Sequence, residues 1–158
     1  MTVSDVETNP FNFKDFSALH RLLLTAFAYM EPRIDPPSSL TKISVDDLRT
    51  KAQAEDLFLI RDAEMPVGCL FGAPRGDAYY IGKLAVAASQ RGQGHARALI
   101  DAAARRAGSL GLPCLELQSR VELVENHIAF GRLGFVQTDA TAHQGYDRPT
   151  SLTFRRAL

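Results

Sequence analysis

The fold is decided by Leu84-Ala85-Val86-Ala87-Ala88-Ser89-Gln90-Arg91-Gly92-Gln93-Gly94-His95-Ala96-Arg97-Ala98-Leu99, which predicts a strand, a short glycine turn and a helix in direct succession. Between Arg91 and Ala96 the side chains are mostly small or thin, so consecutive backbone N–H groups can approach a ligand closely. The first N–H groups of a helix are unpaired and lie at the positive end of its dipole, which favours a bound anion such as a phosphate. We interpret this turn as the functional centre, although its glycines also suit an ordinary strand-to-helix turn.

The composition limits the class of protein. A chain of 158 residues that is 46% hydrophobic can bury a sizeable core, and we expect a single domain over residues 1–158. Lys plus Arg and Asp plus Glu each number 18, so no nucleic-acid or anionic-membrane partner is predicted. The chain has no apolar stretch of membrane-spanning length. Cys69 and Cys114 each lie in an apolar run, and they lack the closely spaced ligand pairs that a zinc site requires. We therefore expect a soluble cytoplasmic protein with reduced cysteines and no metal.

Strands and helices are arranged in a clear order around the glycine turn. The strands expected upstream are residues 57–61, 67–72 and 78–86, separated by short turns. The elements expected downstream are a helix from residue 96 to about 108, a strand at 113–118, a helix at 122–133 and strands beginning at 135 and 150. The upstream strands predict an antiparallel meander, whereas the helical crossover predicts that strand 113–118 runs parallel to strand 78–86. We expect an α/β fold with a mixed central sheet and helices on both faces.

Two helices are predicted ahead of the meander by their capping residues. Asn12 is expected to cap the first, with Asp15 three residues later, and Ser44 the second, with Asp47 three residues later. Three prolines make the connection between these helices a stiff, exposed loop. This loop is either an ordinary connection or part of a substrate pocket, and its candidate substrate-binding residues are Tyr29, Arg33 and Asp35.

Two nucleotide-binding fingerprints fit the glycine turn poorly. A phosphate loop of the Walker type requires a lysine that this turn lacks. A dinucleotide fingerprint requires a third glycine or alanine where Arg97 stands, although Glu116, about twenty residues further on, fits its acidic position. In the dinucleotide-binding fold, the glycine turn follows the first strand of a parallel sheet. Here the strands that precede the turn are expected to be antiparallel. Dinucleotide binding is the third of the functions that we consider.

Two motifs resemble a known family. Arg91-Gly92-Gln93-Gly94-His95-Ala96 resembles the Arg/Gln-x-x-Gly-x-Gly/Ala signature of the GNAT superfamily of N-acetyltransferases, and Leu133-Gly134-Phe135 resembles the Leu-Gly-Phe that follows a helix in that family. The order of elements is similar over nearly the whole chain. The resemblance implies the acyl-CoA N-acyltransferase fold, with a splayed gap between two parallel strands.

The resemblance also implies acetyl-CoA as the cofactor. Its pyrophosphate would bind the N–H groups from Gly92 to Arg97, and its pantetheine arm would bond to the free edge of strand 83–86. A backbone N–H near Leu84 or Ala85 would polarise the thioester carbonyl. The cofactor-binding residues are then Leu84, Ala85, Val86, Arg91, Gly92, Gln93, Gly94, His95, Ala96, Arg97, Asn126 and Phe130.

The activity implied is direct transfer of acetyl to a primary amine of a small molecule or peptide, which normally uses a base and an acid. Phe130 stands where many relatives have a tyrosine near the CoA sulfur, and Gln118 stands where some have a glutamate base. Glu116 and Tyr146 remain as catalytic candidates, the latter beside His143, although each also suits a solvated surface position.

These departures leave a second function open, which is an inactive acyl-CoA-binding regulatory module. The sequence leaves the acceptor and the length of the acyl group undecided. Homodimers are common among relatives, so a homodimer is possible here.

Overall fold

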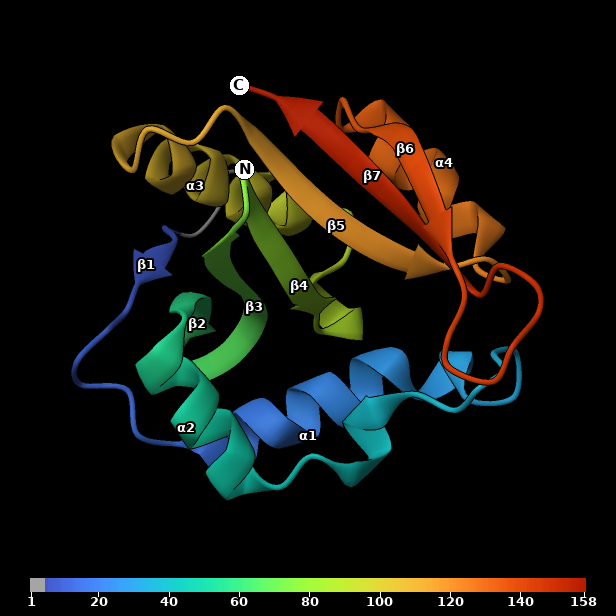
Figure 1. Ribbon diagram of the computed structural model, residues 1–158. Coiled ribbons are helices and arrows are strands. Elements are labelled where there is room, and N and C mark those ends of the chain that lie inside the picture. Colours follow the sequence, from blue (N-terminus) through green and yellow to red (C-terminus); the bar gives the residue numbers. More distant parts are fainter. Residues whose placement is uncertain (1–4) are drawn as a thin grey trace.

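The structure is a computed structural model that describes residues 5–158. One sheet of seven strands runs through it in the order β1-β2-β3-β4-β5-β7-β6 (Figure 1). The strands are β1 Glu7–Thr8, β2 Asp56–Asp62, β3 Met65–Arg75, β4 Ala78–Val86, β5 Cys114–Arg120, β6 Val136–Thr141 and β7 Ser151–Ala157. The pair β4 and β5 is parallel and the other described pairs are antiparallel, which confirms the mixed sheet predicted from the sequence.

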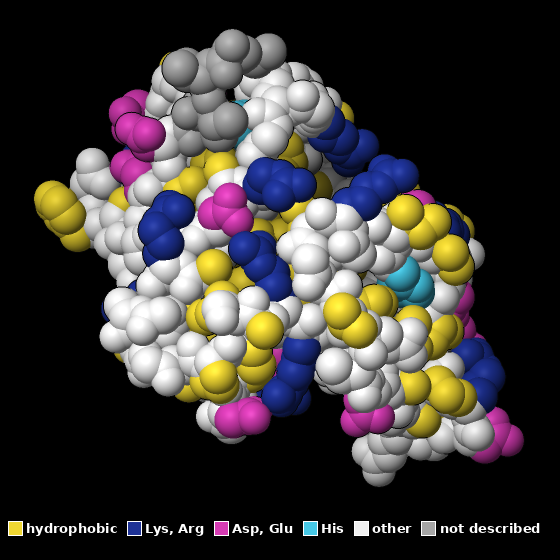
Figure 2. All heavy atoms as spheres, turned by 90° about the horizontal axis from the view of Figure 1, so that it is seen from above, with side chains coloured by type: hydrophobic (Ala, Val, Ile, Leu, Met, Phe, Trp, Pro, Cys, Tyr) yellow, Lys and Arg dark blue, Asp and Glu magenta, His cyan; other side chains and the backbone are white. Residues whose placement is uncertain are grey.

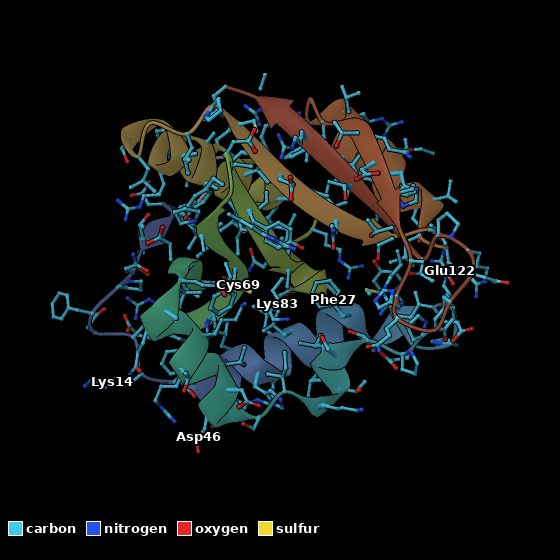
Figure 3. The ribbon with its side chains drawn as sticks, in the orientation of Figure 1. Lys14, Phe27, Asp46, Cys69, Lys83 and Glu122 are labelled. Carbon is cyan, nitrogen blue, oxygen red and sulfur yellow. The ribbon has the colours of Figure 1, made fainter. Side chains whose placement is uncertain are left out.

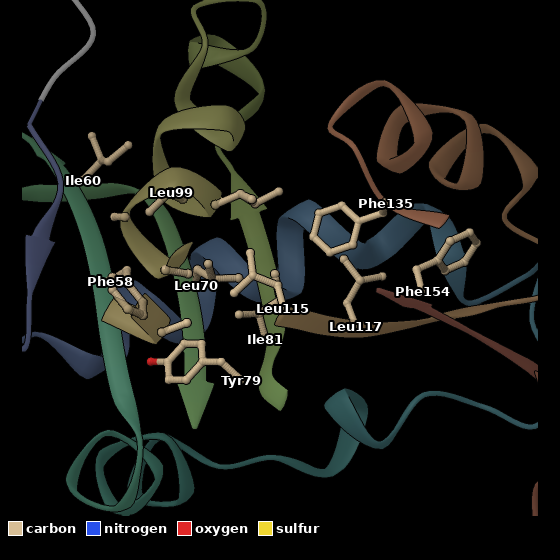
Figure 4. Close-up of a cluster of buried hydrophobic side chains, with 14 residues drawn as sticks. Phe58, Ile60, Leu70, Tyr79, Ile81, Leu99, Leu115, Leu117, Phe135 and Phe154 are labelled. Atoms are coloured by element: carbon tan, nitrogen blue, oxygen red, sulfur yellow. The ribbon is translucent and has the colours of Figure 1, made fainter. Parts of the chain in front are cut away.

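Helices cover both faces of the sheet, with α1 and α2 on one side and α3 and α4 on the other (Figure 1). They are α1 Phe16–Phe27, α2 Val45–Ala54, α3 His95–Ser109 and α4 Val124–Arg132. Successive residues of a strand point to opposite faces, so β2 sends Phe58 towards α3 and Leu59 towards α1. Figure 4 shows the core on the α3 side, where Leu99 packs against Leu70.

The helix caps agree with the sequence in one case and differ in the other. Ser44 and Asp47 form the predicted capping box of α2. Asn12 as the cap of α1 is wrong, because the carboxylate of Asp15 accepts the N–H of Ala18. The side chain of Asn12 instead accepts a hydrogen bond from Arg61. A cap must stand directly before the first helical residue, and that residue is Phe16.

Strands β4 and β5 separate shortly after they begin to pair. Their register contains only Tyr79 opposite Leu115 and Tyr80 opposite Glu116. Further along β4, Lys83 has a φ of 53° and the register with β3 shifts, which marks a β-bulge. A bulge bends its strand and increases the local twist, so it directs β4 away from β5. The predicted gap between the two parallel strands is present (Figure 1).

The surface has no single dominant charge on the face that carries α3 and the C terminus. Figure 2 shows Lys and Arg side chains there interspersed with acidic and hydrophobic ones. Within residues 5–158, none of the helices is both long and apolar enough to span a membrane. Cys69 and Cys114 are both free and buried.

Candidate functional site

The glycine turn presents a row of unpaired backbone N–H groups. After a 3₁₀ turn at Ala88–Gln90, Gly92 and Gly94 adopt φ values of 77° and 83°, and α3 begins at His95. In the described part of the chain, the N–H groups of residues 92–97 have no hydrogen-bond partner, and no side chain caps the helix. A Cβ added at Gly92 would meet nothing within 4 Å. The turn is therefore an open cradle suited to an anion at the positive end of a 15-residue helix.

A hollow of about 430 Å³ lies beside this cradle, and we call it the turn hollow. Six of the predicted cofactor-binding residues line it: Leu84, Ala85, Val86, Arg91, Ala96 and Asn126. Tyr29 lines it as well, and its hydroxyl accepts a hydrogen bond of 2.9 Å from Nδ2 of Asn126. The structure thus places residues from β4, the turn, α4 and the end of α1 around one hollow.

A second cavity, of about 330 Å³, occupies the gap between β4 and β5, and we call it the gap cavity. Phe27, Leu84 and Asn126 line both the gap cavity and the turn hollow, so the two adjoin. Phe130 also lines the gap cavity and packs its ring 6.1 Å from those of Phe135 and Phe154. A path for an elongated ligand therefore leads from the glycine turn to the gap between the parallel strands.

The edge of β4 can offer backbone hydrogen bonds to a ligand on this path. Ala87 donates its N–H to the carbonyl of Val67 on the β3 side. Because N–H groups alternate between the two edges of a strand, the N–H of Val86 points to the opposite edge, towards the gap. Pairing with β5 ends at Tyr80, which leaves this edge free.

The side chain of His95, one of the predicted cofactor-binding residues, is buried. It is 3% exposed, and its Nε2 lies 3.2 Å from Oε1 of Gln90 beneath the turn. Only the backbone N–H of His95 therefore belongs to the cradle. Its Nδ1 is buried and has no hydrogen-bond partner within residues 5–158.

The two predicted catalytic residues, Glu116 and Tyr146, form an ion pair and a hydrogen bond with other side chains. The carboxylate of Glu116 lies 2.8 Å from the guanidinium of Arg155, which is its cross-strand neighbour on β7. The hydroxyl of Tyr146 donates a 2.6 Å hydrogen bond to Asp35, which raises the pKa of this tyrosine. Neither residue lines the gap cavity or the turn hollow. The structure therefore places both outside the path described above.

His143, the neighbour that the sequence associated with Tyr146, does line the gap cavity. The Oγ1 of Thr150 accepts the backbone N–H of His143 at 2.8 Å and donates its own proton to the carbonyl of Thr141. Nδ1 of His143 contacts the same oxygen and donates to it in the tautomer that carries its proton on Nδ1. In that tautomer, Nε2 of a neutral His143 has a lone pair that can accept a proton.

The proline-rich loop after α1 is tied down by ion pairs. Arg33 pairs with Glu125 on α4, and Asp35 pairs with Arg148 at 3.3 Å. Figure 1 shows this loop beside the segment that precedes β7. Arg33 and Asp35 line neither the gap cavity nor the turn hollow, so they position the loop, whereas Tyr29 alone of the three predicted substrate residues faces the path.

Lys83 and Arg120 were not predicted as site residues, yet both line the gap cavity. Figure 3 shows Lys83 between the end of β4 and α1, on the same side as Cys69 and Phe27. Burial, followed by the positive charge of Lys51, lowers the pKa of Lys83. One signal was available in the sequence, because a lysine inside an apolar strand that leads into a functional turn is unusual.

Comparisons with known proteins agree with this geometry. A family model described as "Acetyltransferase (GNAT) family" matches residues 16–135, which is more than half of the chain. A GCN5-related N-acetyltransferase from Rhodopseudomonas palustris superposes with a TM-score of 0.75 at 16% identity, covering 100% of this chain and 99% of the other. A GNAT acetyltransferase from Staphylococcus aureus gives a TM-score of 0.73 at 11% identity, covering 96% and 98%.

A third solved structure holds a ligand. It is a Bacillus anthracis protein described as a streptothricin acetyltransferase in complex with acetyl coenzyme A, and it matches with a TM-score of 0.60 at 17% identity over 66% of this chain and 62% of the other. A search of the curated proteins gives no match.

Proposed function

Because the chain belongs to the acetyltransferase (GNAT) family, we propose that it transfers an acetyl group from acetyl-CoA to the primary amine of a small molecule or peptide. The observation that carries this proposal is the continuous path from the N–H cradle at residues 92–97 through the turn hollow to the gap cavity. One end of the path is an anion site and the other end is a cavity at a free strand edge. This arrangement suits a long ligand that carries a pyrophosphate.

The cofactor would be held mainly by backbone groups. The N–H groups of residues 92–97 suit a pyrophosphate, because they are unpaired within the described chain and a Cβ at Gly92 would have open space around it. The free edge of β4 suits an extended arm, which would add to the sheet as another strand does. Bound acetyl-CoA would supply its acetyl group as a thioester, which an amine can attack directly.

Among the described residues that line the gap cavity, His143 is the one placed to accept a proton. An amine must lose its extra proton before it can act as a nucleophile, and His143, which lines this cavity, would accept that proton at Nε2 while Nδ1 donates to Thr150. The N–H of Val86, turned towards the gap, would donate to a developing negative charge. Phe130 cannot donate a proton, so the leaving thiolate would take its proton from water.

Measurement of CoA release with a thiol reagent tests the proposal. The protein is incubated with acetyl-CoA and a panel of amines, amino acids and peptides, and acetylated product is identified by mass spectrometry. Calorimetric titration with CoA and with NAD measures cofactor binding separately. Binding of CoA together with amine-dependent release supports the enzyme, whereas affinity for NAD alone would overturn the cofactor assignment.

A second candidate function is an acyl-CoA-binding regulatory module without activity. Two observations favour it: Phe130 has no hydroxyl, and Glu116 is held by Arg155. It predicts tight CoA binding with no release of CoA for any amine. The free thiols of Cys69 and Cys114 support a cytoplasmic location under either function.

A further inference from the structure

The gap cavity carries positive charge and no negative charge. Its cationic side chains are Lys83 from β4 and Arg120 from the end of β5, and the imidazole of His143, from the segment before β7, also lines it. No Asp or Glu is among the described residues that line it. A cavity lined in this way attracts anionic groups and repels cationic ones.

Three carboxylates around the cavity already form ion pairs with other residues. Glu55 pairs with Lys51 at 2.6 Å, Glu116 with Arg155 and Asp35 with Arg148. Glu122, at the same end as Arg120, accepts the N–H of Asp35 through Oε2, has a buried Oε1 without a partner within residues 5–158, and does not line the cavity. Glu55, Glu116 and Asp35 are therefore not available to balance the charge inside the gap cavity.

Lys83 and Arg120, by contrast, lack acidic partners within residues 5–158. The ammonium of Lys83 makes no hydrogen bond or ion pair there, although the residue is half-buried. Arg120 donates to the backbone carbonyls of Pro36 at 2.6 Å and Pro37 at 3.3 Å. These two contacts orient its guanidinium without neutralising it, and three of its five N–H donors are left over.

Resting on the proposed function, we propose that the acceptor is a small amine that also bears an anionic group, a carboxylate or a phosphate, and that Lys83 and Arg120 bind this group. Arginine N–H groups match two oxygens of either anion, and the lysine adds a mobile point charge. The cavity volume of about 330 Å³ suits a molecule of amino-acid size. Such an acceptor would present its amine near His143, which lines the same cavity.

Matched pairs of acceptors test this proposal. Free amino acids are compared with their carboxamides, and phosphoethanolamine with ethanolamine, so the two arms separate carboxylate from phosphate recognition. We expect kcat/KM for the preferred anionic member to exceed that for its neutral partner by about tenfold or more, since hydrogen bonds to charged groups are among the stronger ones. Lys83→Met and Arg120→Gln should each reduce the ratio of kcat/KM for the anionic member to kcat/KM for its neutral partner.

The control is Lys42→Met, which removes an exposed lysine outside both hollows and should leave the preference unchanged. Calorimetric CoA binding confirms that each variant is folded. Equal or faster turnover of the neutral members would overturn the anionic acceptor but leave the acetyltransferase standing.

If no amine is turned over, the proposed function fails, and the same pairs are titrated into the CoA-bound protein instead. Binding of the anionic member about tenfold more tightly than the neutral one would still support the anion site. Equal binding, or no binding of either, would overturn it.

Discussion

Asn126 on α4 donates a hydrogen bond of 2.9 Å to the hydroxyl of Tyr29, in the 3₁₀ turn Ala28–Met30 that follows α1. The two residues are 97 positions apart, and both line the turn hollow. Their contact connects helices from the two opposite faces of the sheet, at the hollow where the proposed cofactor path crosses between them (Figure 1).

We expect Tyr29→Phe and Asn126→Ala each to raise the KM for acetyl-CoA by roughly fivefold, because one hydrogen bond contributes about 1 kcal/mol. The double variant should be no worse than the poorer single variant, since both substitutions remove the same contact. Initial rates against acetyl-CoA concentration measure the effect. Additive losses in the double variant would show that the two side chains act independently.

Gly92→Ala should weaken CoA binding by about tenfold or more, because it strains a backbone with a φ of 77° and places a methyl group in the cradle. Gly76→Ala is the matched control. Gly76 has a φ of 62° and equally open surroundings, but it lies in the turn between β3 and β4. Both variants should lose similar thermal stability, and only Gly92→Ala should lose affinity in a calorimetric titration. Equal CoA affinity in the two variants would show that the cradle at residues 92–97 does not bind CoA.

His143→Gln should lower kcat about 100-fold with little change in the KM for acetyl-CoA, because it removes the proton acceptor but leaves the cofactor path intact. Steady-state kinetics under saturating acetyl-CoA measure this. Glu116→Gln and Tyr146→Phe test the alternatives that the sequence favoured. If either of them lost as much activity as His143→Gln, the proton acceptor would lie elsewhere.

Asp56 should make the stability of the protein depend on pH under acid conditions. Its carboxylate accepts hydrogen bonds from Tyr79 at 2.5 Å, Asn9 at 2.8 Å and Arg106 at 3.0 Å. Burial acts to raise the pKa of Asp56, but these hydrogen bonds and the charge of Arg106 outweigh it and lower the pKa. A lowered folded pKa contributes stability above the unfolded value of about 3.9, and the contribution disappears as the pH falls through the folded pKa.

Urea unfolding of wild type and Asp56→Asn between pH 7 and pH 3 measures this contribution. The wild type should be the more stable at pH 7, and the difference should shrink below about pH 4. Asp147→Asn is the control, because Asp147 is exposed and makes no hydrogen bond within the described chain. A difference that did not change with pH would mean that Asp56 acts through packing and not through its charge.

The sequence by itself determined the order of elements and the cradle. Local spacing was enough for both, because a helix, a strand and a glycine turn are each fixed by residues that stand close together in the chain. The capping box of Ser44 and Asp47 and the parallel pairing of β4 with β5 were predicted for the same reason. The cradle could also be found because backbone N–H groups do the binding, so no distant side chain had to be located.

Only the tertiary structure decided which side chains face the gap. Glu116 is held by Arg155 because the register of β5 and β7 places them opposite each other, 39 residues apart. Lys83 lines the cavity at a bulge in β4, and His143 lines it because a distant loop folds back beside the strands. The direction of a side chain from a strand changes with every residue of register, and register is set by packing across the whole sheet. The chemistry at the gap therefore depends on long-range contacts, whereas the cofactor cradle depends on a stretch of six residues.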